Sequence, residues 1–139
     1  MKPRLASIVV TKKRPPAEHW KKEPEEHDFP AAADYLSLLV PEESLAPLIE
    51  ELGAAGMVSR KAKDLLRASR LPLLEANDPE VAKHLKRVAG GDRLSPVLLV
   101  RGHAQIDRAL IVADGYHRIC ASYHLNEDAE IPCRIVDLP

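Results

Sequence analysis

The sequence predicts an α+β protein, in which a small mixed β-sheet with packed helices follows a helical N-terminal half. Two patterns lead to this prediction. Apolar residues recur at helical spacing through the first half of the chain, whereas the second half contains short, β-branched apolar runs separated by turns. The 139 residues, 45% of them hydrophobic and 29% charged, suit one globular domain of this kind.

Residues 1–28 are expected to form a basic, extended arm in front of that domain. Residues 1–22 hold seven lysines and arginines against one acid, although the net charge of the whole chain is −1. Several prolines favour an extended linker here. Residues 2–22 therefore suit contacts with nucleic-acid phosphates, while a solvated tail explains the same charges. Trp20 either docks on the domain or stacks on a partner, and both alternatives stay open.

The domain is predicted over residues 29–139, and its first part, residues 29–76, is expected to be helical. Three short helices are indicated by a capping residue followed by apolar residues at helical spacing: 31–39 after Asp28, 45–52 after Ser44, and 60–68 after Ser59. No catalytic constellation is apparent in this part. Its apolar helices provide packing, and they leave a homodimer interface open.

The second part, residues 77–139, is predicted to carry the sheet. Asp78 caps a helix over 79–89 that Gly90 ends. The apolar runs 94–100 and 109–113 lack alternation, so we expect an antiparallel hairpin buried on both faces. A helix over 115–125 follows, with a core stripe of Tyr116, Ile119, Cys120 and Tyr123. The final strand, over 131–138, is expected at the sheet edge because it contains Pro132.

The polar string Asp114-Gly115-Tyr116-His117-Arg118, called the box below, lies where the second apolar run gives way to that helix. The unpaired backbone N–H groups and the positive end of the helix dipole favour an anion there. Gly115 permits an unusual φ, and the side chains of His117 and Arg118 add donors for phosphate oxygens. Asp114 caps the helix, accepts a hydrogen bond from a ligand, or holds Mg²⁺ through a phosphate. The box therefore predicts a phosphate or nucleotide site, with a merely structural turn as the alternative.

The box and the residues before it resemble the ParB/sulfiredoxin superfamily over roughly residues 79–137. The resemblance rests on a helix ending in glycine, the strand pattern Leu94-Ser95-Pro96, a second strand, and a G-x-[HR]-R-x-x-A box from Gly115 to Ala121. It implies a ParB-like domain that contacts nucleotide phosphates through the box. Sulfiredoxins resemble this box but place a reactive cysteine where this chain has Tyr116, so sulfinic acid reduction is not expected.

Other polar residues in the second part of the domain are candidate contacts for phosphate or metal. Arg101, His103 and Arg108 in the loop between the apolar runs are a second line of candidate phosphate contacts, against the alternative of a simple polar loop. His117, Cys120 and His124 lie along two turns of a helix and do not converge on one zinc ion, so we assign no metal ligands. Cys120 and Cys133 are expected to be free, buried thiols.

Two functions of different classes follow from these observations. The first is a ParB-like module that binds a nucleotide with Mg²⁺, or another phosphate ligand, at the box, with or without hydrolysis of a phosphate ester. The second is a nucleic-acid-associated protein, either a weak nuclease or an accessory DNA binder, that uses the basic arm. A nuclease needs an arrangement of acids and metal that the sequence does not reveal, and no catalytic residue is assigned. A non-catalytic regulatory domain is a third alternative.

Ordinary composition and the absence of a long apolar stretch also bear on location. No run approaches the roughly 20 apolar residues of a membrane span. A cytoplasmic protein without membrane contact is expected. ParB partition proteins continue into a helix-turn-helix reader of DNA, whereas this chain stops at Pro139, so we expect a stand-alone ParB-like domain.

Overall fold

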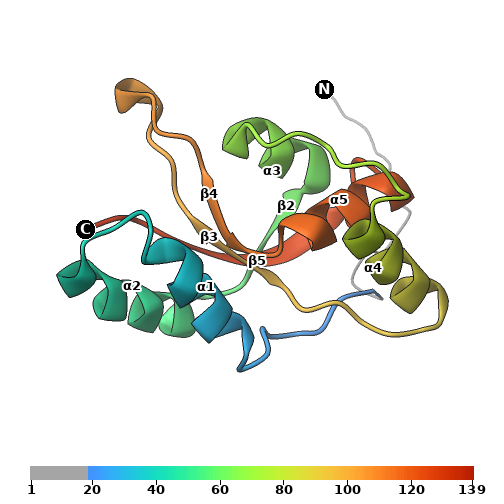
Figure 1. The fold of residues 1–139 in the computed structure, drawn as a ribbon, viewed down its shortest axis with the longest axis horizontal. Helices are drawn as coiled ribbons and strands as arrows, with labels where there is room; N and C mark the ends of the chain where they lie inside the picture. The colour runs from blue at the N-terminus through green and yellow to red at the C-terminus, as the bar shows by residue number, and fades with distance from the viewer. Residues whose placement is uncertain (1–18) are drawn as a thin grey trace, which may run out of the picture.

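The computed structural model describes residues 19–139, which form an α+β fold as expected (Figure 1). Five α-helices and one four-stranded mixed sheet occur in this part of the chain. The elements are α1 (Asp28–Leu36), α2 (Glu42–Ala54), β2 (Val58–Lys61), α3 (Ala62–Ser69), α4 (Pro79–Ala89), β3 (Val97–Val100), the 3₁₀ turn η2 (Ala104–Ile106), β4 (Ile111–Asp114), α5 (Tyr116–Leu125) and β5 (Glu130–Val136). None of these helices is both long enough and apolar enough to cross a membrane.

The sheet has the strand order β2-β5-β3-β4. Strands β3 and β4 form the expected antiparallel hairpin, and β3 also pairs with β5 in parallel. Helices α1 and α2 cover one face of the sheet, where Leu98 and Val100 are buried. Helices α3, α4 and α5 cover the other face, where Val97 and Leu99 are buried (Figure 1). Burial on both faces explains why the apolar runs show no alternation.

The sequence analysis did not predict strand β2, and for this reason its predictions for the start of α3 and for the position of the last strand were wrong. Residues 58–61 form strand β2, which pairs antiparallel with β5, and the helix that follows starts at Ala62 instead of after Ser59. All four residues of β2 are exposed, so the strand has no apolar pattern that marks it in the sequence. Because β2 occupies the edge, β5 is an interior strand and Pro132 lies opposite Ser59.

The predicted helix cap was correct for α4 and wrong for α1 and α2, because Asp28 is the first residue of α1 and makes no capping hydrogen bond. The carboxylate of Asp78 accepts hydrogen bonds from the N–H groups of Glu80 and Val81, both at 3.1 Å. Helix α2 begins after Pro41, so Ser44 lies inside its first turn instead of capping it. No side chain caps α2, and two glutamates in its first turn interact favourably with the helix dipole.

Trp20 docks on the domain, which decides between the two alternatives left open for it. Its side chain is buried in the core cluster that also contains Val97 and Ile119. The backbone on either side pairs with Leu94, whose N–H and C=O bond to His19 and Lys21 at 2.7 Å. Of the predicted arm, residues 1–18 lie outside the described part, and residues 19–28 run along the body and end at Asp28.

We expect Gly115→Ala to destabilise the fold by about 3 kcal/mol, because it combines backbone strain with overpacking. Gly115 has φ +117°, and a Cβ there would lie 2.4 Å from Cγ1 of Val97. Gly91→Ala is the matched control, since Gly91 has φ +93° but open space around it, and should cost about 1 kcal/mol. Urea unfolding measures both values, and equal losses would contradict the packing role of Gly115.

Candidate functional site

The box lies where strand β4 ends and helix α5 begins. Gly115 is buried with its left-handed backbone pressed on Val97, the first residue of β3. Helix α5 begins at Tyr116 and receives no hydrogen bond from a capping side chain. The capping alternative for Asp114 was therefore wrong, and its carboxylate is available for other contacts.

Asp114 forms an ion pair with Arg118 one turn further along. The Nη2 of Arg118 donates to Oδ2 of Asp114 at 2.9 Å and to the carbonyl of Pro96 at 3.3 Å. The exposed fractions of the two side chains are only 13% and 17%, so this pair is largely shielded from water. The Nε of Arg118 is buried and has no acceptor within the described residues. Arg118 is thus held at the box with donor capacity left over.

A second carboxylate reaches this pair from the N-terminal half of the chain. Asp28, at the start of α1, is 2% exposed, and its Oδ2 accepts hydrogen bonds from the hydroxyl of Ser95 and from the N–H of Glu25, the latter at 2.9 Å. Its carboxyl is also close enough to Asp114 to raise the pKa of that acid. Two acids from distant segments therefore meet beside Arg118.

The environment of Asp114 favours its protonated form. Burial raises the pKa of Asp114, and the neighbouring Asp28 carboxyl raises it further, while the charge of Arg118 opposes both effects. We call Asp28, Asp114 and Arg118 the acid–arginine cluster.

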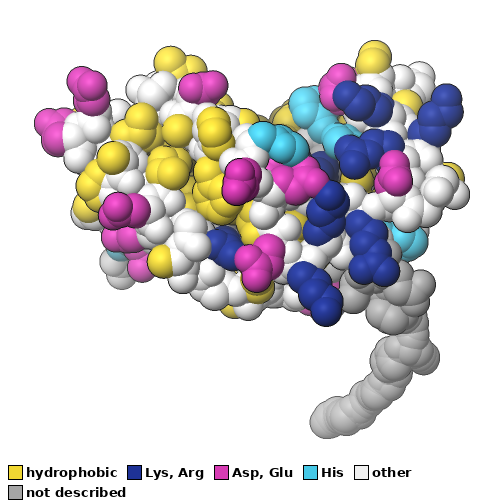
Figure 2. All heavy atoms as spheres, turned by 90° about the horizontal axis from the view of Figure 1, so that it is seen from below, with side chains coloured by type: hydrophobic (Ala, Val, Ile, Leu, Met, Phe, Trp, Pro, Cys, Tyr) yellow, Lys and Arg dark blue, Asp and Glu magenta, His cyan; other side chains and the backbone are white. Residues whose placement is uncertain are grey.

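The donor atoms next to this cluster suit a divalent cation. One ligand atom each of Glu25, His27 and Asp28 lies within 4.8 Å of the others. The Nε2 of His27 is 3.2 Å from a Glu25 oxygen and 3.5 Å from Oδ1 of Asp28. Two carboxylates with one imidazole fit Mn²⁺ well, whereas Mg²⁺ prefers oxygen ligands alone. Figure 2 shows acidic, histidine and basic side chains gathered between the α1–α2 part and the α4–α5 part of the surface.

His84 of α4 is a further group near the box. Its Nδ1 is buried without a partner in the described residues. Burial and the nearby charge of Arg118 lower the pKa of His84 to about 4. The imidazole is therefore neutral at pH 7, and it adds no positive charge to a box that already contains Arg118.

Tyr116 and His117 differ in how far their side chains are held by contacts within the fold. The hydroxyl of Tyr116 donates to the carbonyl of Pro72, and the ring packs against the core, so this side chain serves the fold. His117 is half-buried beside the Tyr116 ring, at 5.4 Å between ring centroids. It makes no side-chain hydrogen bond within residues 19–139. Of the two, His117 is the one placed to meet a ligand.

The second line of predicted residues lies away from the box. Leu98 pairs with Asp114 at one end of the hairpin, whereas Arg101, His103 and Arg108 belong to the loop beyond Val100 at the other end. The structure does not bring them to the box, because the length of the strands separates the two places. They line a different cavity together with α3.

The cysteines are free and buried, as expected. Burial raises the pKa of the Cys120 thiol and raises that of Cys133 to about 11. Both are poor nucleophiles for that reason. The Nε2 of His124 lies 2.7 Å from the Leu74 carbonyl oxygen, and Cys120 is buried in the core.

Sequence reasoning missed three residues that the structure brings to the box. Asp28 was interpreted only as the start of a helix, Ser95 only as part of a strand pattern, and His84 not at all. Ser95 stands between Leu94 and Pro96 in the quoted pattern, so its place near the box was readable. Nothing in the sequence relates Asp28 or His84 to Asp114, because only packing of α1 and α4 around the sheet does so.

We expect His84→Gln to reduce the loss of stability in acid. Folding lowers the pKa of His84, so the neutral ring stabilises the fold above pH 6.5, and this contribution is lost as the pH falls from 6.5 to about 4. The part-exposed ring limits the difference between wild type and variant to about 1–2 kcal/mol over that range. Urea unfolding at both ends of the range measures it. His103→Gln, at an exposed histidine, should behave as the wild type, and an unchanged acid loss in His84→Gln would contradict the assignment.

Comparison with known proteins identifies no relative of this chain. No family model, curated protein or solved structure matches the chain. The resemblance to the ParB/sulfiredoxin superfamily therefore stays a prediction from the residues quoted for it.

Proposed function

We propose that this chain binds a nucleotide or another phosphate ester at the box, together with a divalent cation. The observation that carries the proposal is the acid–arginine cluster, in which the buried carboxyls of Asp28 and Asp114 meet beside Arg118 at the start of α5. The positive end of α5 and its uncapped N–H groups face the same corner. The resemblance to ParB-like domains is consistent with this position for the phosphates.

The charges of the cluster explain how the cation and the phosphate depend on each other. When the two acids hold one proton between them, the cluster of two carboxyls and one guanidinium is electrically neutral. Replacement of that proton by a divalent cation leaves one excess positive charge. A phosphate oxygen neutralises this charge, while Arg118 and His117 donate to other oxygens of the same group. The ligand is therefore expected to bind well only when the cation is present.

The same acids bear on the alternative of a nuclease. The sequence did not show an acid and metal arrangement, and Glu25, His27, Asp28 and Asp114 now supply candidates for one. A cation on these side chains would activate water near a bound phosphodiester. Hydrolysis of a phosphodiester is thus our second candidate function, and cleavage of bis(p-nitrophenyl) phosphate with Mn²⁺ is its direct assay.

We expect titration calorimetry to detect ATP, CTP or GTP in the presence of Mg²⁺ or Mn²⁺, and Arg118→Gln to weaken binding about 10- to 100-fold, the scale of a lost charge-assisted contact. Arg87→Gln is the control, since Arg87 lies on α4 and pairs with Asp92 at 3.8 Å instead of with an acid of the box. Circular dichroism verifies that both variants fold. No heat from any of the three nucleotides at millimolar concentration would overturn the proposal.

We also expect cation binding to release a proton. A cation held beside Asp28 favours the ionised form of Asp114, whose pKa is raised, so cation affinity should fall as the pH is lowered through that raised pKa. Calorimetry with Mn²⁺ in buffers of different ionisation enthalpy counts the protons released. Asp114→Asn should abolish the release, whereas Asp92→Asn, at an exposed acid after α4, should leave it unchanged. Equal proton release in the Asp114 variant would contradict a role of Asp114 in this release.

A further inference from the structure

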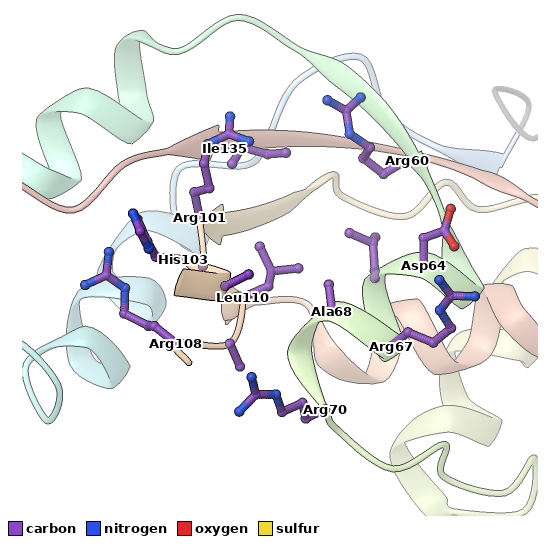
Figure 3. A pocket seen from close by; sticks show the side chains of 14 residues that line it. Arg60, Asp64, Arg67, Ala68, Arg70, Arg101, His103, Arg108, Leu110 and Ile135 are labelled. Carbon is purple, nitrogen blue, oxygen red and sulfur yellow. The ribbon is translucent and has the colours of Figure 1, made fainter. Parts of the chain in front are cut away.

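A cavity lined by several arginines lies at the opposite end of β3 from the box. It has a volume of about 460 Å³ and opens between α3, strand β2 and the β3–β4 loop (Figure 3). Its lining includes five arginines from separate segments of the chain: Arg60, Arg67, Arg70, Arg101 and Arg108. The only acid in the lining is Asp64, and no residue of the box takes part.

The floor of this arginine cavity is apolar and held in place by the backbone. Leu65, Ala68, Leu110 and Ile135 form it, and in Figure 3 the arginines surround Ala68 and Leu110. The N–H of Leu110 donates to the carbonyl of Ala68 at 3.0 Å, which ties the hairpin loop to α3. A Cβ on Gly102 would lie 2.6 Å from the carbonyl oxygen of Arg108, so only glycine lets the two sides of the loop approach this closely.

The arginines differ in how far their charges are neutralised. Arg70 pairs with Asp107 at 2.6 Å and Arg101 pairs with Asp137 at 2.7 Å. Within residues 19–139, no carboxylate forms an ion pair with the other three, Arg60, Arg67 and Arg108. The Nε of Arg108 is in addition buried without an acceptor. The cavity therefore holds more positive charge than its own acids balance.

We propose that the arginine cavity binds a nucleoside diphosphate or triphosphate without a metal ion. Guanidinium groups bind phosphate oxygens through paired hydrogen bonds, and the two positive charges left after Asp64, Asp107 and Asp137 are counted favour an anion with more than one negative charge. The apolar floor accepts a flat base, on which a guanidinium plane can also stack. The volume lies in the range of cavities that enclose small molecules, which favours a nucleotide over a nucleic-acid chain. This inference does not depend on the function proposed for the box.

Calorimetry in EDTA tests the arginine cavity alone, since the box is expected to need a cation. The probes are ADP, pyrophosphate, AMP and adenosine at one ionic strength. ADP should bind more tightly than pyrophosphate, because the base adds contact with the apolar floor, and more tightly than AMP, because a second phosphate engages more arginines. Added salt should weaken the binding of ADP.

Substitutions of arginines test whether ADP binds in the arginine cavity. The double variant Arg67→Gln/Arg108→Gln should weaken ADP about tenfold or more in EDTA. Arg93→Gln/Arg87→Gln is the matched control, because it removes two arginines outside the cavity, and it should bind as the wild type. Arg118→Gln should also bind ADP normally in EDTA, which separates this site from the box. No ADP binding in EDTA, equal affinity of the cavity variant and the wild type, or stronger binding of a short DNA oligonucleotide than of ADP would each overturn the proposal.

Discussion

Strand β3 is the constraint on which the rest of the structure depends. Its four residues are all buried, and it pairs with β4 on one side and with β5 on the other. Each end of the strand then presents one polar region. The box packs on Val97 at its start, where Gly115 allows direct contact, and the loop beyond Val100 carries the arginines. Because the strand is rigid and buried, these two regions are held apart and cannot merge into one site.

The two regions balance charge in opposite ways. At the box, two carboxyls lie near one guanidinium, and burial raises the pKa of Asp114, which favours its protonated form. At the loop, several guanidiniums face a single acid of the lining, and their charges stay permanent because arginine does not deprotonate. The first arrangement suits exchange of a proton for a cation. The second suits an anion directly, and the difference follows from which ionisable types are gathered.

Local signals in the sequence were informative where neighbouring residues decide the structure. The cap at Asp78, the glycine at the start of α5 and the two apolar runs of the hairpin involve contacts within a few residues, and each was identified correctly. Strand β2 was not predicted, because the contacts that form it are distant in the sequence. Its residues are exposed and charged or polar except Val58, and only pairing with β5, about 70 residues later in the chain, makes them a strand.

The same distinction between local and long-range contacts applies to the candidate site. The sequence by itself determined the fold class, the double-sided burial of the hairpin and the donors at the start of α5, because helix ends and apolar runs follow from local geometry and hydrophobicity. Only the tertiary structure decided that Asp28 and Asp114 meet, that Trp20 docks on the body, and that five arginines share one cavity. These contacts join segments far apart in the chain. Their proximity depends on how the helices pack on the two faces of the sheet, which no spacing in the sequence expresses.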